Sequence, residues 1–191
     1  MKESVATSEL LKYRANHVVP KRIENCIDAI LRKDFQKFAE ITMKDSNQFH
    51  AVCLDSYPPI TYMSDTSHHI ASLIHAFNDS LNEIKVAYTF DAGQNACLFL
   101  LEKNAPLVLA FINHYFPPKS SIDGYDDYFK GEKVEAVNLP QEVIQSIGVA
   151  PLPPGSLKGL IYTEVGEGPE ILTKAEHLLN ESGLPITKNS N

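Results

Sequence analysis

Residues 86–96, VAYTFDAGQNA, combine a strand pattern with a polar turn that opens on an acid. Apolar side chains alternate along residues 85–91, and this period of two predicts a β-strand ending at Asp91. The next apolar run, residues 96–101, starts after a short turn, so the two segments are expected to pair antiparallel. Because the second run is apolar on both faces, we expect it to be a central strand.

Amphipathic patterns on either side of this hairpin predict helices. They cover residues 4–17, 20–31, 35–56, 65–77, 105–116 and 140–147. Asp34 and either Ser64 or Asp65 are suitable N-caps. The helix over 20–31 is expected to bury an apolar stripe, made of Ile23, Cys26, Ile27, Ile30 and Leu31. The helix after Asp34 has a polar centre, residues 44–48, which either lines a site or forms a solvated face.

A few strands interleaved with amphipathic helices predict the α+β class, with helices packed on one face of an antiparallel sheet. The length of 191 residues and a hydrophobic content of 43% are those of one domain, expected to span residues 1–191. Proline-rich residues 117–157 are expected to form an irregular excursion, residues 157–165 a last strand, and residues 180–191 a frayed tail.

The composition excludes several classes of partner. A net charge of −7 without any basic block argues against nucleic acid as a partner. No apolar run approaches the roughly 18–20 residues needed to cross a bilayer, and the first residues lack the apolar stretch of a signal peptide, so a cytosolic protein without membrane contact is expected. Three widely separated cysteines favour neither a disulfide framework nor a metal site.

Asp91 is the first candidate for chemistry. A carboxylate at the end of an apolar strand is costly to bury but useful at a sheet edge where a ligand can dock. Ala92 and Gly93 have little bulk to block a substrate, and Gly93 permits a sharp turn. On local sequence alone, an acid before a turn is more often a capping or Asx-turn residue. Both interpretations stay open at this level.

Two other patterns carry weaker signals. His68, His69 and His75 include a pair seven residues apart, but that gap spans about 10 Å along a helix, so surface histidines are favoured over a metal site. The glycines of residues 166–169, GEGP, are followed by a proline that removes an N–H where a phosphate loop needs donors. We interpret that segment as a strand-ending turn.

Three stretches go beyond these general patterns, namely residues 4–24, 43–67 and 86–96. Together they resemble the mevalonate diphosphate decarboxylase family, a branch of the superfamily of galactokinase, homoserine kinase, mevalonate kinase and phosphomevalonate kinase (GHMP kinases). The resemblance implies a ferredoxin-like α/β sandwich, the carboxy-terminal domain of that superfamily. It also implies conversion of mevalonate diphosphate to isopentenyl diphosphate with ATP and Mg²⁺, by phosphorylation of a tertiary hydroxyl followed by loss of phosphate and carbon dioxide, in a cytosolic homodimer.

The family's TFDAGPN motif matches residues 89–95, which places its catalytic aspartate on Asp91. Ala92, Gly93 and Asn95 match the rest of the motif and are expected to support the catalytic turn. Gln94 departs from the family's proline, which is expected to loosen the turn without removing the acid.

The family's ATP-cradling Gly/Ser-rich loop and phosphate-gripping arginine have no counterpart in these 191 residues. The resemblance therefore implies a carboxy-terminal half without the ATP-binding domain, expected to be inactive alone and to bind no cofactor tightly. The alternative is a shortened, non-enzymatic isoform that acts as an interaction or dimerisation module.

Overall fold

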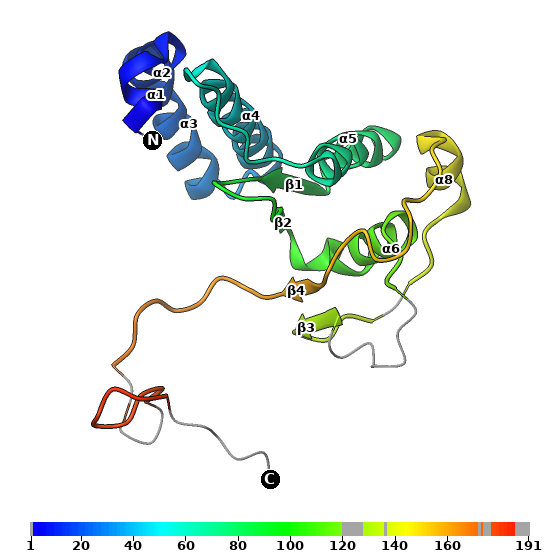
Figure 1. Ribbon diagram of the computed structural model, residues 1–191. Coiled ribbons are helices and arrows are strands. Elements are labelled where there is room, and N and C mark those ends of the chain that lie inside the picture. The colour runs from blue at the N-terminus through cyan, green and yellow to red at the C-terminus, as the bar shows by residue number, and fades with distance from the viewer. Residues whose placement is uncertain (1, 120–127, 136, 172, 174–176, 186–191) are drawn as a thin grey trace.

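The computed structural model describes residues 2–119, 128–135, 137–171, 173 and 177–185. Helices lead up to a small hairpin, and shorter elements follow it (Figure 1). Before the hairpin come α1 (Lys2–Thr7), α2 (Glu9–Tyr13), a π-helical segment (Arg14–Val18), α3 (Val19–Leu31), α4 (Phe35–Asp55) and α5 (Asp65–Ser80). The hairpin is β1 (Val86–Thr89) and β2 (Cys97–Leu100). After it come a 3-10 turn (Glu102–Asn104), α6 (Ala105–Tyr115), β3 (Phe129–Gly131), α8 (Gln141–Ile147) and β4 (Leu160–Tyr162).

The hairpin confirms the antiparallel pairing expected from the sequence. β1 and β2 pair in the register Val86↔Leu100 to Thr89↔Cys97. Both α4 and α5 pack against β1, which makes a small antiparallel sheet with helices, the α+β class that the sequence predicts. The expectation that β2 is a central strand is wrong for the described part of the chain, where β1 is its one strand partner.

The core lies where α4, α5 and α6 meet β1. Val86, Ala87 and Tyr88 of β1 are all buried, so this strand is enclosed on both faces. The rings of Phe77 on α5 and Phe111 on α6 stack with centroids 4.3 Å apart, which joins the two helices directly. Burying large aromatic side chains is the main source of stability in a core of this size.

Local polar residues set the helix ends. The Asp34 side chain accepts a hydrogen bond from the N–H of Lys37 and begins α4, while Ser64 and Ser67 form a reciprocal capping box that begins α5. The helix predicted over residues 4–17 is interrupted at Ser8. The Ser8 hydroxyl accepts from the N–H of Leu11 and donates to the Asp55 carboxylate at 2.7 Å, so α2 starts anew there.

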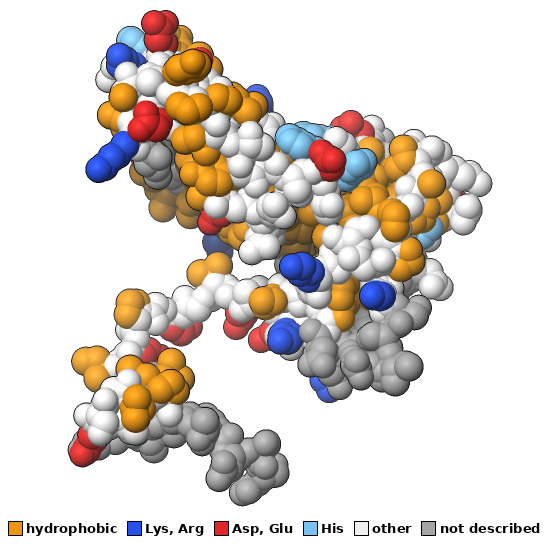
Figure 2. Space-filling model, viewed as in Figure 1, with side chains coloured by type: hydrophobic (Ala, Val, Ile, Leu, Met, Phe, Trp, Pro, Cys, Tyr) orange, Lys and Arg blue, Asp and Glu red, His pale blue; other side chains and the backbone are white. Residues whose placement is uncertain are grey.

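The apolar stripe of α3 is not buried as expected. Side-chain exposure is 54% at Ile23, 53% at Ile27, 57% at Ile30 and 77% at Leu31. Figure 2 shows hydrophobic side chains exposed over the amino-terminal helices. The helix instead turns the face that carries Arg22 and Ala29 toward α4, where Arg22 pairs with an acid of that helix.

The segment after α6 contains more order than the predicted excursion. Within residues 117–157, β3 and α8 form, and residues 120–127 and 136 lie outside the described part. β3 pairs in parallel with β4, a contact that the sequence did not predict. The strand expected over 157–165 is limited to Leu160–Tyr162, which pairs with the three residues of β3, and the chain beyond it is exposed. Of the tail expected to fray, residues 186–191 lie outside the described residues.

Asn78 joins the end of α5 to the start of β1. Its side chain is buried, donates to the carbonyl of Val86 at 2.8 Å, and accepts from the N–H groups of Lys85 at 2.9 Å and Val86 at 3.3 Å. Three main-chain groups at the start of β1 thus depend on one amide.

We predict that Asn78→Ala lowers the free energy of unfolding by about 2–4 kcal/mol, because it leaves buried main-chain groups without partners. Urea denaturation of the 191-residue chain measures this loss. Asp79→Ala, at the exposed neighbouring position, is the matched control and should change stability by less than about 0.5 kcal/mol. Equal stability of the two variants would contradict the assigned role of Asn78.

Candidate functional site

Asp91 lies just beyond the end of β1 with an exposed side chain. Within the described residues its carboxylate makes no hydrogen bond or ion pair, so the Asx-turn interpretation finds no support in the geometry. Gly93 is not among the glycines with a positive φ, and a Cβ added there would lie 3.7 Å from Asp91 Oδ1, an ordinary contact distance. The turn therefore needs no glycine conformation at Gly93, and the exposed carboxylate lies beside this small residue.

The turn from Asp91 to Asn95 is exposed at Ala92, Gln94 and Asn95 and half-buried at Gly93. The Ser67 hydroxyl of α5 donates to the carbonyl of Gln94 at 3.2 Å. This bond ties the carboxy-terminal side of the turn to a helix N-terminus.

The amino-terminal side of the turn is tied to α4. The N–H of Phe90 donates to Ser46 Oγ at 2.9 Å, and the carbonyl of Phe90 accepts from His50 Nε2 at 3.2 Å. Phe90, Ser46 and His50 are all buried. The residue that precedes Asp91 is thus held by two α4 side chains.

The polar centre of α4, residues 44–48, neither lines a cavity around Asp91 nor forms only a solvated face. Ser46 binds the backbone of Phe90, and the Asn47 side chain accepts a hydrogen bond from the Tyr88 hydroxyl at 2.9 Å. Asp45 and Gln48 accept from arginines of earlier elements. Most of these polar side chains therefore connect α4 to a neighbouring segment.

Two arginines converge on Asp45. Arg14 and Arg22 approach Asp45 Oδ1 at 2.9 Å and 2.8 Å, and both also donate to Gln48 Oε1. Arg14 is 12% exposed and Arg22 20% exposed, whereas Asp45 is 41% exposed. Burial alone would raise the pKa of the Asp45 carboxyl, but the hydrogen bonds and charges of the two arginines outweigh it and lower the pKa below its usual value.

The histidines that invited a metal interpretation do not converge. His68 and His69 are exposed, and His69 Nδ1 donates to the carbonyl of Asp65. His75 Nε2 lies 3.1 Å from the Tyr88 hydroxyl. Among the described residues, no group of three or more His, Cys, Asp or Glu side chains could hold a metal ion.

Burial raises the pKa of the Tyr88 hydroxyl, and the hydrogen bond from this hydroxyl to Asn47 has the opposite, smaller effect.

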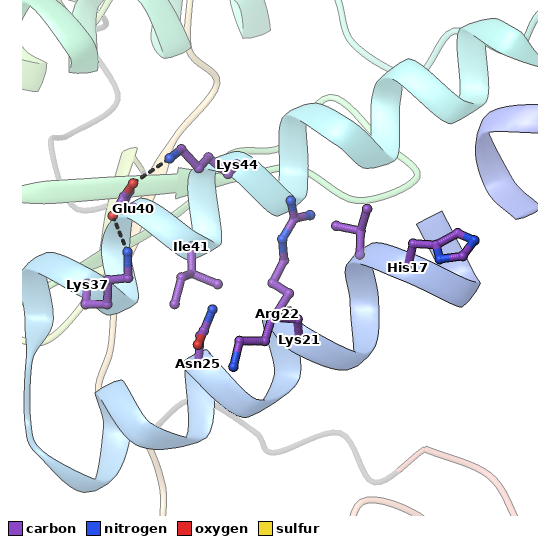
Figure 3. A pocket seen from close by; sticks show the side chains of 9 residues that line it. His17, Lys21, Arg22, Asn25, Lys37, Glu40, Ile41 and Lys44 are labelled. Atoms are coloured by element: carbon purple, nitrogen blue, oxygen red, sulfur yellow. Dashed lines mark hydrogen bonds and ion pairs between the residues drawn. The ribbon is translucent and has the colours of Figure 1, made fainter. Parts of the chain in front are cut away.

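A separate groove of about 320 Å³ runs between α3 and α4 (Figure 3). Cationic side chains predominate in its lining, which includes Lys21, Arg22, Lys37 and Lys44, while Glu40 points into the same groove and bonds to the last two. Those hydrogen bonds lower the pKa of Glu40 to about 2. Asp91 is not among the lining residues, so this groove is not the candidate site.

Sequence reasoning missed Ser46 and His50 as neighbours of the acid. They are separated from Phe90 by 44 and 40 residues, and neither a helical nor a strand period relates positions that far apart. The one available signal was the polar centre of α4, which indicated that polar partners were needed there.

Comparison with known proteins connects this geometry to a family. Residues 1–172 match the mevalonate 5-diphosphate decarboxylase C-terminal domain. The chain belongs to the mevalonate 5-diphosphate decarboxylase family. A diphosphomevalonate decarboxylase from Danio rerio is 47% identical over 186 residues, which cover 97% of this chain and 46% of that protein. The enzyme of the same name from Saccharomyces cerevisiae is 53% identical over 138 residues, 72% of this chain and 34% of that protein.

Solved structures agree with that assignment. The mevalonate diphosphate decarboxylase from Trypanosoma brucei superposes with a TM-score of 0.82 at 33% identity, over 94% of this chain and 47% of that one. A decarboxylase from Enterococcus faecalis superposes with a TM-score of 0.56 at 28% identity, over 61% of this chain and 35% of that one. This chain spans less than half the length of the curated relatives that it matches. None of its described helices is long and apolar enough to cross a membrane.

We predict that Asp45→Asn lowers the free energy of unfolding at pH 7 by about 1–2 kcal/mol, since two largely buried arginines lose their counter-charge at a site that solvent partly screens. Because the pKa of Asp45 is lower in the folded state, the stabilisation by its carboxylate increases with pH. The stabilisation is complete above about pH 4, the ordinary Asp range, and is lost as pH falls through the lower folded-state pKa.

Urea unfolding of both proteins at pH 7 and pH 3 checks this prediction. The difference in free energy of unfolding between wild type and Asp45→Asn should be smaller at pH 3 than at pH 7. Asp28→Asn is the matched control, because Asp28 forms an exposed pair with Arg32, and this variant should behave like wild type at both pH values. If the free energy of unfolding of Asp45→Asn differed more from that of wild type at pH 3 than at pH 7, the stabilising role of the Asp45 carboxylate would be contradicted.

Proposed function

We propose that this chain is the acid-bearing half of an ATP-dependent mevalonate diphosphate decarboxylase, with Asp91 as the catalytic residue. The observation that carries the proposal is the Asp91 carboxylate itself, exposed and without a protein partner in the described residues, on a turn tied down at both ends. A catalytic base needs this combination of a fixed backbone and a carboxylate available to substrate.

The chemistry asked of Asp91 follows from the substrate. A tertiary alcohol is a poor nucleophile, and a carboxylate within hydrogen-bond reach can orient its hydroxyl and accept its proton. The same negative charge stabilises positive charge that develops when phosphate and carbon dioxide leave. Ala92 and Gly93 leave room beside the acid, and Asn95 completes the exposed turn.

Two solved structures of related decarboxylases support the part of the proposal that concerns ATP and Mg²⁺. The Enterococcus faecalis decarboxylase was described with mevalonate diphosphate mediated ATP binding, and another superposable structure, MDDEF, was solved with MVAPP, AMPPCP and magnesium. Because this chain spans less than half the length of its curated relatives, the proposal places most contacts to ATP and Mg²⁺ on segments outside these 191 residues.

A second candidate function is a non-enzymatic module that binds another protein or a second copy of itself. The exposed apolar stripe of α3, centred on Ile23, Ile27 and Ile30, favours it, because such a surface is typical of an interface. This surface and the candidate acid are on different elements, so the two functions are compatible, and a cytosolic homodimeric enzyme would combine them.

We predict that Asp91→Asn lowers kcat by at least about 10²-fold, because the amide keeps the shape of the side chain but cannot accept the proton. The measurement uses a hybrid in which these 191 residues replace the aligned segment of the Danio rerio enzyme. Asp79→Asn is the matched control, an equivalent change at an exposed position on α5. Unchanged turnover in the Asp91→Asn hybrid would refute the proposed catalytic role.

We also predict that the 191-residue chain alone binds ATP with a dissociation constant in the millimolar range or weaker, since phosphate positioning by cations and backbone donors supplies most nucleotide affinity in such enzymes. Isothermal titration calorimetry with ATP and Mg²⁺ measures it. The hybrid serves as the positive control. Micromolar affinity for the isolated chain would sink this prediction and point to a nucleotide site within it.

A further inference from the structure

Phe90, the residue before Asp91, has no strand partner in the hairpin ladder, which ends at the Thr89↔Cys97 pair. Side chains of α4 replace that partner. Ser46 Oγ accepts from the Phe90 N–H at 2.9 Å, and His50 Nε2 donates to the Phe90 carbonyl at 3.2 Å. Because positions four apart in a helix lie on the same face, both side chains reach the main chain of the same residue, Ser46 at the peptide group before the Phe90 Cα and His50 at the one after it.

These two contacts are shielded from water. Exposure is 4% at Ser46, 9% at His50 and 3% at Phe90. A carbonyl only accepts, so the Nε2 atom of His50 carries a hydrogen. Edge-to-face contacts with Phe90 and Tyr62, at centroid distances of 6.4 Å and 6.5 Å, fix the plane of the imidazole. Breaking either buried hydrogen bond leaves a polar group without a partner.

The far side of the turn is held independently. Ser67, a member of the α5 capping box, donates to the carbonyl of Gln94 at 3.2 Å. Only Asp91, Ala92 and Gly93 separate the two anchored residues. The backbone that carries the acid is therefore fixed from α4 on one side and from α5 on the other, while the carboxylate is exposed.

We propose that Ser46 and His50 are positioning residues, which clamp Phe90 and thereby hold the Asp91 carboxylate in the orientation that proton acceptance requires. The proposal rests on the function proposed above. A displacement of about 1 Å in a reacting group can cost about 10²-fold in rate, so a clamp one residue from the acid has a large effect. Both side chains are buried, so loss of the clamp is expected to act through Asp91, on kcat rather than on KM.

The clamp itself is tested in the 191-residue chain, with no need for activity. Amide hydrogen exchange followed by NMR should show the Phe90 N–H protected in wild type and exchanging at least about ten-fold faster in Ser46→Ala. Thr42→Val is the matched control, because the Thr42 hydroxyl bonds to the carbonyl of Phe38 one turn earlier on the same helix and makes no hydrogen bond to Phe90. Phe90 exchange that is equal in the two variants overturns the clamp.

The positioning role is tested by turnover in the Danio rerio hybrid. Ser46→Ala and His50→Leu should lower kcat about ten-fold or more with KM within about two-fold, at a temperature where circular dichroism shows every variant folded. His50→Gln should restore kcat to within about three-fold of wild type, since its side-chain Nε2 can donate from a place close to that of the imidazole Nε2. A merely structural role would give neither this split between kcat and KM nor this rescue.

The two proposals fail in different ways. If Asp91→Asn abolishes turnover while Ser46→Ala and His50→Leu keep the kcat of Thr42→Val, the positioning role is overturned and the catalytic assignment stands. If Asp91→Asn keeps full turnover, the catalytic assignment is refuted and the positioning role is refuted with it.

Discussion

The contact between the middle of α4 and strand β1 is the constraint on which the rest of the structure depends. β1 is enclosed by helices, and its polar atoms near the core have no access to water, so they need partners within the protein. Ser46 binds the main chain at Phe90, and Asn47 binds the hydroxyl of Tyr88. On the adjoining side of the same helix, Asp45 holds Arg14 and Arg22. One helical turn thus connects the sheet to the amino-terminal helices.

The α5 helix completes this arrangement from the other side. Its Ser67 holds Gln94, its His75 meets the Tyr88 hydroxyl, and its Asn78 receives the start of β1. Side chains of a second helix therefore support the beginning and the middle of the strand and the far side of the turn that follows it. A polar network of this kind fixes a single register, because a shift of one residue would leave several buried groups unpaired.

The elements that sequence reasoning predicted well are those set by local chemistry. Asp34 and Ser64 begin their helices as expected, α8 ends at Ile147 as the predicted range 140–147 requires, and the alternation before Asp91 gives the right strand and hairpin pairing. The predictions failed where an interaction between residues far apart in the sequence determines which face of a helix is buried or which strands pair. The spacing of apolar residues in α3 indicated a buried stripe, but the ion pair of Arg22 with Asp45 turns another face inward. Likewise, β4 forms only over the three residues that pair with β3, and periodicity gives no sign of that partner.

The candidate acid came from a motif, and its supporting residues could come only from the fold. Asp91 is conspicuous in sequence because it ends an apolar run, whereas Ser46 and His50 are ordinary polar residues in a helix until the strand is placed against them. Burial and hydrogen-bond geometry identify such supporting residues, because they show which buried groups have no alternative partner. Sequence spacing does not contain this information.

The outer edge of β2 has a practical consequence for work with this chain. Half-buried Leu98, Phe99 and Leu100 lie on a strand whose other edge has no partner among the described residues. Exposed main-chain donors and acceptors beside apolar side chains are a template on which further chains can add as strands. The chain is therefore expected to self-associate more as its concentration rises. A short peptide that occupies the edge of β2 is expected to keep more of it monomeric.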